Sequence, residues 1–172
     1  MTVLLLVRHG ETDWNAEGRL QGHTDTPLND YGRRQAAALA EELAGDGIAA
    51  IYASDLSRAR ETAEILGGRI GLPVTVETDL REKNWGSWEG LTPAERESVE
   101  YVGESTEEHR ERTLRALVAI AERHPGERVL VVTHGGSVRR VQAAVSGFAM
   151  PVIGNCDVWT CVHEDGSFSS LH

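Results

Sequence analysis

The chain has 172 residues, of which 40% are hydrophobic, a size and composition typical of one globular domain. Its formal net charge of −10, from 27 acidic and 17 basic residues, argues against a nucleic-acid partner, which would need a basic surface. No apolar run is long enough to span a bilayer and no secretory-signal pattern opens the chain, so we expect a single domain over residues 1–172, no membrane partner and a cytoplasmic location.

The first half of the chain alternates strand-like apolar runs with helical patterns. In chain order, the pattern predicts a strand at 3–7, a helix at 30–44, a strand at 50–53, a helix at 57–66 and a strand at 74–77. Asn29 is the expected N-cap of the first helix. Gly67-Gly68 is the expected stop of the second, because consecutive glycines favour the end of a helix.

The second half opens with an irregular region and then resumes the alternation. Residues 79–103 mix charges, tryptophans and glycines, and Pro93 after Thr92 can begin a brief helix there. Ser105 to Glu108 forms a capping box that opens a long helix. The remaining elements are a strand at 129–132, a helix at 137–146, and a hairpin formed by 158–162 and 168–171 around Gly166.

This alternation of strands and helices predicts an α/β fold. A mainly parallel sheet results, covered by helices on both faces. The terminal hairpin is expected at one edge of that sheet, where an unpaired strand could support a homodimer.

Polar residues follow two of the apolar strands at their carboxyl ends. Arg8-His9 follows the first strand, and His134-Gly135 follows the strand at 129–132. Ligands of open α/β sheets bind beyond the carboxyl ends of parallel strands. A single strand-end histidine is ordinarily a turn or packing residue. Two of them, one beside an always-charged arginine, favour a catalytic site.

Four separated motifs resemble the signatures of the histidine phosphatase superfamily, the phosphoglycerate-mutase-like fold. They are Arg8-His9-Gly10, Ser54 to Ala63, Leu80-Arg81-Glu82 with Gly86 to Gly90, and Thr133 to Gly136. The resemblance extends from Val3 to about Gly147. It implies a three-layer α/β/α fold with a mainly parallel sheet and an enzyme that transfers phosphoryl groups.

The resemblance also implies a role for each strand-end residue. His9 is the nucleophile and carries the phosphoryl group as phosphohistidine. Its other ring nitrogen needs an acceptor, for which a backbone carbonyl is the natural candidate. Arg8 and Arg58 bind the nonbridging phosphate oxygens as directional, permanently charged donors. His134 stabilises the charge that develops in the transition state.

Four further residues match the substrate-binding positions of the family: Asn15, Gln21, Gly22 and Gly135. Asparagine and glycine are also common turn formers. A structural role and a binding role therefore both remain open for the first three of these residues.

Glu82 is the expected proton donor to the leaving oxygen, and its carboxylate then activates water against phosphohistidine. The alternative is a surface carboxylate paired with Arg81 or Lys83, and the surrounding motif favours catalysis. We expect no metal and no cofactor, because arginines supply the positive charge. The other histidines follow no strand end and lack metal-site spacing: His23, His109, His124, His163 and His172.

The superfamily contains phosphatases and mutases, which differ in how they treat water. A mutase must exclude water to return the phosphoryl group to a substrate. By resemblance, cofactor-dependent mutases carry an insertion after the third motif and a C-terminal tail over the site. Here only Leu91 to Val102 follows that motif, so we expect a short lid near residues 79–104 and a site open to water.

The sequence thus favours a metal-independent phosphomonoester hydrolase acting on a small phosphorylated metabolite. It looks most like α-ribazole phosphatase, sugar-phosphate phosphatases and metal-independent phosphoserine phosphatase. The first alternative is a cofactor-dependent phosphoglycerate mutase. The second is a noncatalytic phospho-ligand-binding protein, which is expected to have lost at least one of the five catalytic residues that this chain retains: Arg8, His9, Arg58, Glu82 and His134.

Overall fold

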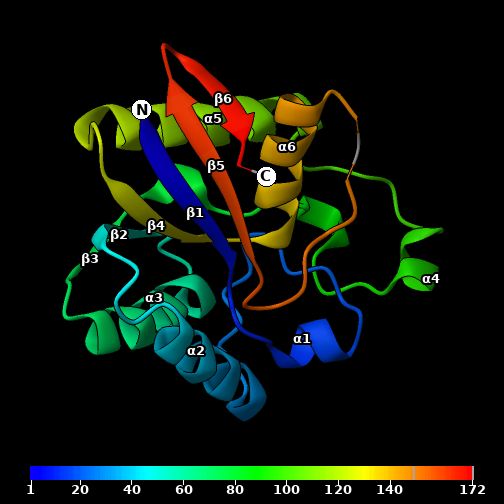
Figure 1. Cartoon of the computed structure of the whole chain (residues 1–172). Helices are drawn as coiled ribbons and strands as arrows, with labels where there is room; N and C mark the ends of the chain where they lie inside the picture. The colour runs from blue at the N-terminus through cyan, green and yellow to red at the C-terminus, as the bar shows by residue number, and fades with distance from the viewer. Residues whose placement is uncertain (149, 172) are drawn as a thin grey trace.

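A six-stranded sheet lies between two layers of helices in the computed structural model, which describes residues 1–148 and 150–171 (Figure 1). His172 lies outside the described residues. The strands are β1 (Thr2–Arg8), β2 (Ile48–Ala53), β3 (Val74–Val76), β4 (Arg128–Thr133), β5 (Val158–Glu164) and β6 (Ser167–Ser170). Their order in the sheet is β3-β2-β4-β1-β5-β6.

The predicted α/β class and the mainly parallel sheet are confirmed. Strands β3, β2, β4 and β1 pair in parallel, whereas β5 runs antiparallel to β1 and forms a hairpin with β6. The predicted hairpin therefore occupies one edge of the sheet, with β6 as the edge strand.

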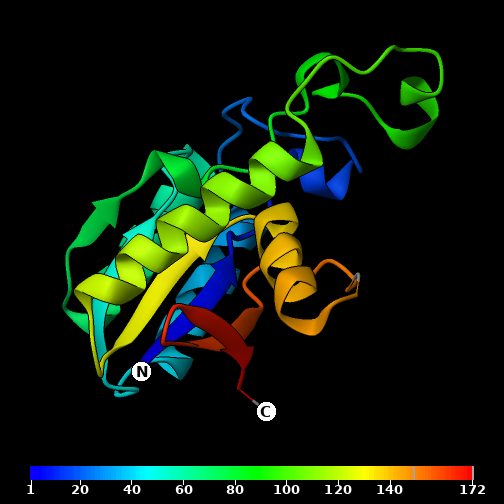
Figure 2. The same ribbon diagram turned by 90° about the horizontal axis from the view of Figure 1, so that it is seen from above.

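Two long helices cover each face of the sheet. Helices α2 (Asp30–Glu42) and α3 (Ser57–Ile70) lie on one face, and α5 (Thr106–Arg123) and α6 (Gly135–Ser146) lie on the other (Figures 1 and 2). The short helical turns are α1 (Asp13–Ala16), η1 (Thr78–Leu80), η2 (Gly86–Trp88) and α4 (Pro93–Arg96). Within the described part of the chain, no helix has the length and apolar character that crossing a bilayer requires.

Side chains of the central strands alternate between the two helical layers. Leu4 and Leu6 of β1 pack with α5 and α6, whereas Leu5 and Val7 pack with α2 and α3. This alternation follows from the two-residue period of a strand, and it explains why β1 is apolar at every position from Val3 to Val7. The resulting two cores, one on each face, hold the carboxyl ends of β1 and β4 rigidly side by side.

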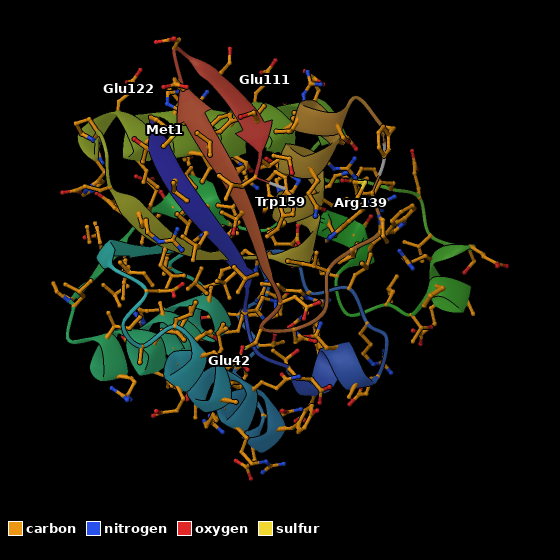
Figure 3. All side chains as sticks on the ribbon, in the orientation of Figure 1. Met1, Glu42, Glu111, Glu122, Arg139 and Trp159 are labelled. Carbon is orange, nitrogen blue, oxygen red and sulfur yellow. The ribbon has the colours of Figure 1, made fainter. Side chains whose placement is uncertain are left out.

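Charged side chains lie on the solvent faces of the covering helices. Glu111 and Glu122 of α5 point away from the molecule (Figure 3), and Glu42 of α2 is exposed on the other face. The acidic surplus of the chain is thus carried in part by helix faces that do not touch the sheet.

Helix α3 continues past the predicted stop at Gly67-Gly68 and ends at Ile70, so that boundary prediction was wrong. The left-handed C-cap is Gly71, with a φ of 86°. Gly67 has a packing role instead, because a Cβ there would lie 2.6 Å from the carbonyl oxygen of Leu72 as the chain turns back. Helix α1, which begins at the N-cap Thr12, was not predicted.

Residues 84–104 form a segment that projects from one end of the sheet (Figure 2). The rings of Trp85 and Trp88 stack at a centroid distance of 6.3 Å, and Trp88 Nε1 donates to the Val99 carbonyl oxygen at 2.8 Å. The brief helix predicted at Pro93 is confirmed as α4, with Thr92 in a capping box. These local contacts give the projecting segment an internal structure of its own.

The first turn of α2 packs against the loop that follows His9, and Gly32 makes this approach possible. A Cβ at Gly32 would lie 2.2 Å from the carbonyl oxygen of Glu11. We expect Gly32→Ala to lower the free energy of unfolding by about 1–3 kcal/mol, as overpacking of a tight contact does. Urea denaturation followed by circular dichroism measures this loss.

The matched control is Gly68→Ala in α3, where a Cβ would meet no atom within 4 Å. There the better helix propensity of alanine is expected to raise the free energy of unfolding by roughly 0.5–1 kcal/mol. Equal effects of the two substitutions would contradict the close contact at Gly32.

Candidate active site

The two strand-end histidines lie side by side because β1 and β4 are neighbours in parallel register. Arg8 is paired with Thr133, so the next residue of each strand leaves the sheet at the same edge. The backbone N–H of His9 donates to the Thr133 carbonyl oxygen at 3.0 Å. The rings of His9 and His134 are 5.2 Å apart between centroids, at an interplanar angle of 61°.

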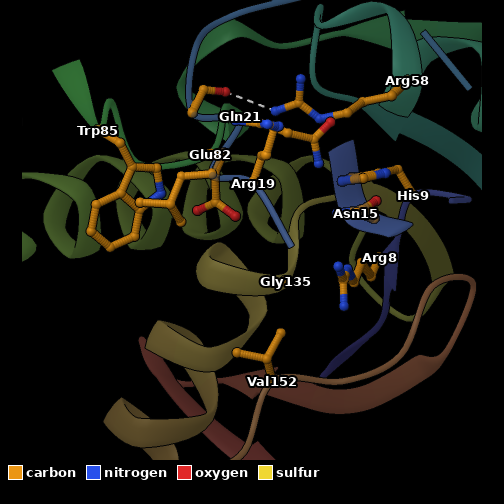
Figure 4. A pocket seen from close by; sticks show the side chains of 12 residues that line it. Arg8, His9, Asn15, Arg19, Gln21, Arg58, Glu82, Trp85, Gly135 and Val152 are labelled. Carbon is orange, nitrogen blue, oxygen red and sulfur yellow. Dashed lines mark hydrogen bonds between the residues drawn. The ribbon is translucent and has the colours of Figure 1, made fainter. Parts of the chain in front are cut away.

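A pocket of about 170 Å³ opens beside these histidines (Figure 4). Eight of the nine sequence-predicted site residues line it: Arg8, His9, Asn15, Gln21, Gly22, Arg58, Glu82 and Gly135. The ninth, His134, is fully buried and packs against the His9 ring. The structure therefore brings together residues of all four motifs and the loop that carries Asn15, Gln21 and Gly22.

The His9 imidazole is held in one tautomer by the backbone. Its Nδ1 lies 2.7 Å from the Gly10 carbonyl oxygen, which can only accept, so Nδ1 carries the proton and Nε2 keeps its lone pair. The expected backbone acceptor is thus present. Burial, together with the charges of Arg58 and Arg8, holds the pKa of His9 well below 6.5. A neutral ring with a free Nε2 is a competent nucleophile at neutral pH.

Arg58 enters the pocket from the first turn of α3 and is fully buried. Its guanidinium donates to the carbonyl oxygens of Gly22 at 2.7 Å and Thr24 at 3.0 Å. Burial lowers the pKa of Arg58 to about 10, so the group stays charged at neutral pH. Because its acceptors are neutral carbonyls, its positive charge remains available to an anion.

Arg8 lies on the other side of His9 and is held in the same manner. Its guanidinium donates to the Ile153 carbonyl oxygen at 2.7 Å, and burial lowers its pKa. Neither Arg8 nor Arg58 forms a salt bridge with a carboxylate of the described residues. Two guanidinium groups that flank an imidazole nucleophile form a site suited to a phosphate group.

His134 has two buried ring nitrogens, and neither has a hydrogen-bond partner among the described residues. Burial, followed by the charge of Arg58, holds its pKa well below 6.5. A neutral buried imidazole with free ring atoms is an unusual arrangement, because buried polar groups are ordinarily satisfied. The ring lies directly behind His9, which lines the pocket.

Glu82 is fixed by backbone N–H groups and is not a surface ion pair. Its carboxylate oxygens accept from the N–H of Lys83 at 2.8 Å and from that of Gly136, in the first turn of α6, at 2.9 Å. Arg81, the alternative partner considered from the sequence, instead forms a salt bridge with Asp55. Glu82 and Trp85 lie beside each other at the pocket (Figure 4).

Three hydrogen bonds from other segments hold the main chain around Glu82. Its carbonyl oxygen accepts from Arg112 at 2.7 Å and from His23 Nε2 at 2.9 Å. The Leu80 carbonyl oxygen accepts from the Thr133 hydroxyl at 2.7 Å, which ties this loop to the end of β4. The carboxylate thus projects from a rigid loop, and Arg112 and His23 have a supporting role that the sequence did not reveal.

Asn15, Gln21 and Gly22, for which the sequence left a structural and a binding role open, make structural contacts and also line the pocket. Asn15 completes the capping box of α1, and its Oδ1 accepts from Asn155 at 3.2 Å. Gln21 Oε1 accepts from the Thr12 hydroxyl at 2.7 Å. Gly22, with a φ of 57°, presents its carbonyl oxygen to Arg58. The Gln21 amide nitrogen has no such partner among the described residues and can face a ligand.

Four other residues line the pocket, and the sequence analysis assigned none of them a binding role: Arg19, Leu20, Trp85 and Val152. Arg19 and Leu20 immediately precede Gln21-Gly22, so their position in this loop was the sequence signal that could have placed them at the pocket. Trp85 lies between Leu80-Arg81-Glu82 and Gly86 of the third motif, so its place in that motif was the available signal. Val152 comes from the loop between α6 and β5, where the sequence carries no signal.

The pocket offers an uncharged nucleophile, two fixed positive charges and a carboxyl group on one face. No group of three or more histidine, cysteine, aspartate or glutamate side chains in residues 1–148 and 150–171 is arranged to hold a metal ion. Two fixed positive charges beside a neutral imidazole and a carboxyl group are the components that phosphoryl transfer needs.

Comparisons with known proteins agree with this geometry. The family model for the histidine phosphatase superfamily (branch 1) matches residues 4–170. The chain is 41% identical to phosphoglycerate mutase-like protein 4 of Arabidopsis thaliana over 155 residues. This alignment covers 79% of this chain and 67% of the relative. It is 40% identical to a metal-independent phosphoserine phosphatase of the same plant over 165 residues. This alignment covers 85% of this chain and 69% of the relative. The solved structure of Bacillus stearothermophilus YhfR aligns with a TM-score of 0.91 and 35% identity, covering 99% of this chain and 95% of that one.

The buried histidines make stability depend on pH. Burial lowers the folded-state pKa of His9 and His134, and that of His109 to about 4. In the unfolded chain each titrates near 6.5, so below that pH the unfolded state binds more protons and the free energy of unfolding falls. We expect a loss of up to about 4 kcal/mol per pH unit between pH 6 and 5, roughly 1.4 for each histidine.

Urea denaturation at pH 7, 6 and 5 measures this loss. His109→Gln removes one of the three groups and is expected to reduce the slope by about a third. A free energy of unfolding that stays constant from pH 7 to 5 would contradict the neutral state of these rings.

Proposed function

Because this chain belongs to branch 1 of the histidine phosphatase superfamily and is a phosphoric monoester hydrolase, we propose that it works through a phosphohistidine at His9. The observation that carries the proposal is the tautomer of His9, whose Nδ1–H donates to Gly10 and leaves Nε2 free between two arginines. The substrates are small phosphorylated metabolites, which match a pocket of about 170 Å³.

In the first step, His9 Nε2 attacks phosphorus in line with the ester oxygen. The N–P bond forms, the P–O bond breaks, and Glu82 gives its proton to the departing oxygen. Arg8 and Arg58 hold the nonbridging oxygens and keep the attacking and leaving atoms aligned. The alcohol then leaves, and the phosphoryl group stays on His9.

In the second step, water replaces the alcohol. Glu82, now a carboxylate, takes a proton from the water as its oxygen attacks phosphorus, and the N–P bond breaks to release inorganic phosphate. The first turn of α6, whose Gly136 N–H already holds Glu82, faces this anionic centre. His134 stabilises charge on the phosphoryl oxygens through its free ring nitrogens.

Hydrolysis is favoured over mutase chemistry by the small size of the projecting segment, residues 84–104. Within it only Leu91 to Val102 follows the third motif, and we propose that it acts as a short lid that leaves the phosphoenzyme accessible to water. A cofactor-dependent phosphoglycerate mutase remains the alternative, since mutases use the same residues. A noncatalytic phosphate sensor has no observation in its favour, because all five catalytic positions are occupied.

The experiment that tests this function is phosphate release from a panel of metabolite monoesters in excess EDTA. The panel includes phosphoserine, 3-phosphoglycerate, sugar phosphates and α-ribazole phosphate, and products are resolved as isomers. We expect release from at least one member at an undiminished rate in EDTA, because the arginines supply the charge. His9→Ala is the control and is expected to release none.

Three results would overturn the proposal. Activity that returns only with Mg²⁺ or Zn²⁺ would contradict the metal-free site. Formation of 2-phosphoglycerate from 3-phosphoglycerate, dependent on 2,3-bisphosphoglycerate, would make the protein a mutase. Substantial turnover by His9→Ala would remove the proposed nucleophile.

Glu82→Gln tests the proton donor. The amide retains the shape of the side chain but cannot protonate an alkoxide, so kcat/KM for an alkyl phosphate is expected to fall by about 10²-fold or more. A p-nitrophenyl phosphate needs little protonation of its leaving group, and its kcat/KM should fall by less than about tenfold. Steady-state kinetics on both esters gives the comparison.

The ratio kcat/KM is the informative quantity, because it reports the steps up to phosphohistidine formation and excludes the later attack of water. Equal losses on the alkyl and aryl esters would remove Glu82 from the role of acid.

A further inference from the structure

His109, from the first half of α5, packs against Glu82 without lining the pocket. Its Nε2 lies 3.7 Å from Glu82 Oε1 and 2.9 Å from the hydroxyl of Ser137. The imidazole is fully buried, although it is far from both strand-end motifs in sequence. The mechanism above does not use this side chain, and a buried histidine beside a catalytic carboxyl needs an explanation.

The hydrogen bonds of Ser137 fix which nitrogen of His109 carries the proton. The Ser137 hydroxyl lies 3.3 Å from the Arg81 carbonyl oxygen, to which it can only donate. Ser137 must therefore accept from His109, so Nε2 carries the proton. That same N–H is the polar group of His109 that faces Glu82.

The His109 ring is neutral in the resting protein. Burial lowers its pKa to about 4, and the positive charges of Arg112 and Arg140 oppose the effect of Glu82 and Glu104. A charged imidazole at this distance would hold Glu82 as an anion, which cannot serve as an acid. Because the ring is neutral, it places no full positive charge beside the carboxyl.

We propose that His109 is a positioning residue that, with Ser137, orients the carboxyl of Glu82 for proton transfer to the leaving oxygen. This inference rests on the proposed role of Glu82 as the acid. The chain of contacts from His109 through Ser137 to Arg81 fixes the backbone immediately before Glu82.

The same chain of contacts reaches the other side of the carboxyl. Ser137 directly follows Gly136, whose N–H holds Glu82 Oε2 at 2.9 Å. A Cβ at Gly136 would lie 2.2 Å from Glu82 Oε1, so the carboxyl is packed tightly against this turn. One histidine thereby restrains the backbone before Glu82 and the helix turn that binds its side chain.

The test compares His109→Leu with His109→Gln by steady-state kinetics on an alkyl phosphate and on p-nitrophenyl phosphate. Leucine fills the site but cannot donate, so kcat/KM for the alkyl ester is expected to fall by about tenfold. This expected loss is smaller than the loss from removing a general acid altogether, which is about 10²–10⁴-fold. The aryl ester is expected to lose less than about threefold, because its leaving group needs little protonation.

Glutamine offers an amide N–H near the position of Nε2 and is expected to restore the alkyl ester to within about threefold of the unsubstituted enzyme. Ser137→Ala removes the acceptor and is expected to show the same selective loss, which keeps the inference testable if His109→Leu folds poorly. Leu117→Val, at a buried position of α5 two turns away, controls for a general loss of packing.

Equal losses on both esters, or a loss that glutamine does not restore, would overturn the positioning role. The two proposals fail in distinguishable ways. If Glu82→Gln shows no dependence on the leaving group, the proposed acid is wrong. If Glu82→Gln shows that dependence while His109→Leu and Ser137→Ala do not, only the role of His109 is wrong.

Discussion

The parallel pairing of β1 with β4 is the constraint on which the site depends. Because Arg8 and Thr133 are opposed in register, His9 and His134 leave the sheet at the same edge and meet at 5.2 Å. Helix α6 begins directly at this edge and directs the N–H of Gly136 at Glu82. The tight cores on both faces of the sheet hold the two strand ends still, so the remaining site residues are placed against a rigid reference.

A single electrostatic arrangement has two effects in this pocket. The guanidinium groups of Arg8 and Arg58 donate to main-chain carbonyls, which hold them in place without cancelling their charge. That charge can bind a phosphate group although the chain as a whole carries −10. The same charge, added to burial, keeps His9 unprotonated and therefore nucleophilic. The two arginines proposed to bind the substrate thus also favour the neutral form of the proposed nucleophile.

The carboxyl of Glu82 is placed differently, by hydrogen bonds to its oxygens and to its main chain. Main-chain N–H groups hold its oxygens, Arg112 and His23 hold its carbonyl, and the neutral ring of His109 lies behind it. For the proton transfer proposed for Glu82, this restraint fixes where the carboxyl lies relative to the pocket. The arginines and Glu82 thus illustrate two ways of organising a site, one by uncompensated charge and one by orientation.

The sequence by itself determined the alternation of strands and helices and the parallel sheet, because these depend on local periodicity. The resemblance of its motifs to a known family indicated the nine residues of the predicted site. It placed the end of α3 too early, since Gly67 is required by the returning chain at Leu72. Only the tertiary structure decided that His109 lies beside Glu82, that Val152 lines the pocket and that Ile153 accepts from Arg8. These partners are separated by 27 to 145 residues, and no local pattern encodes a contact made only when two helices and a loop pack on the same sheet edge.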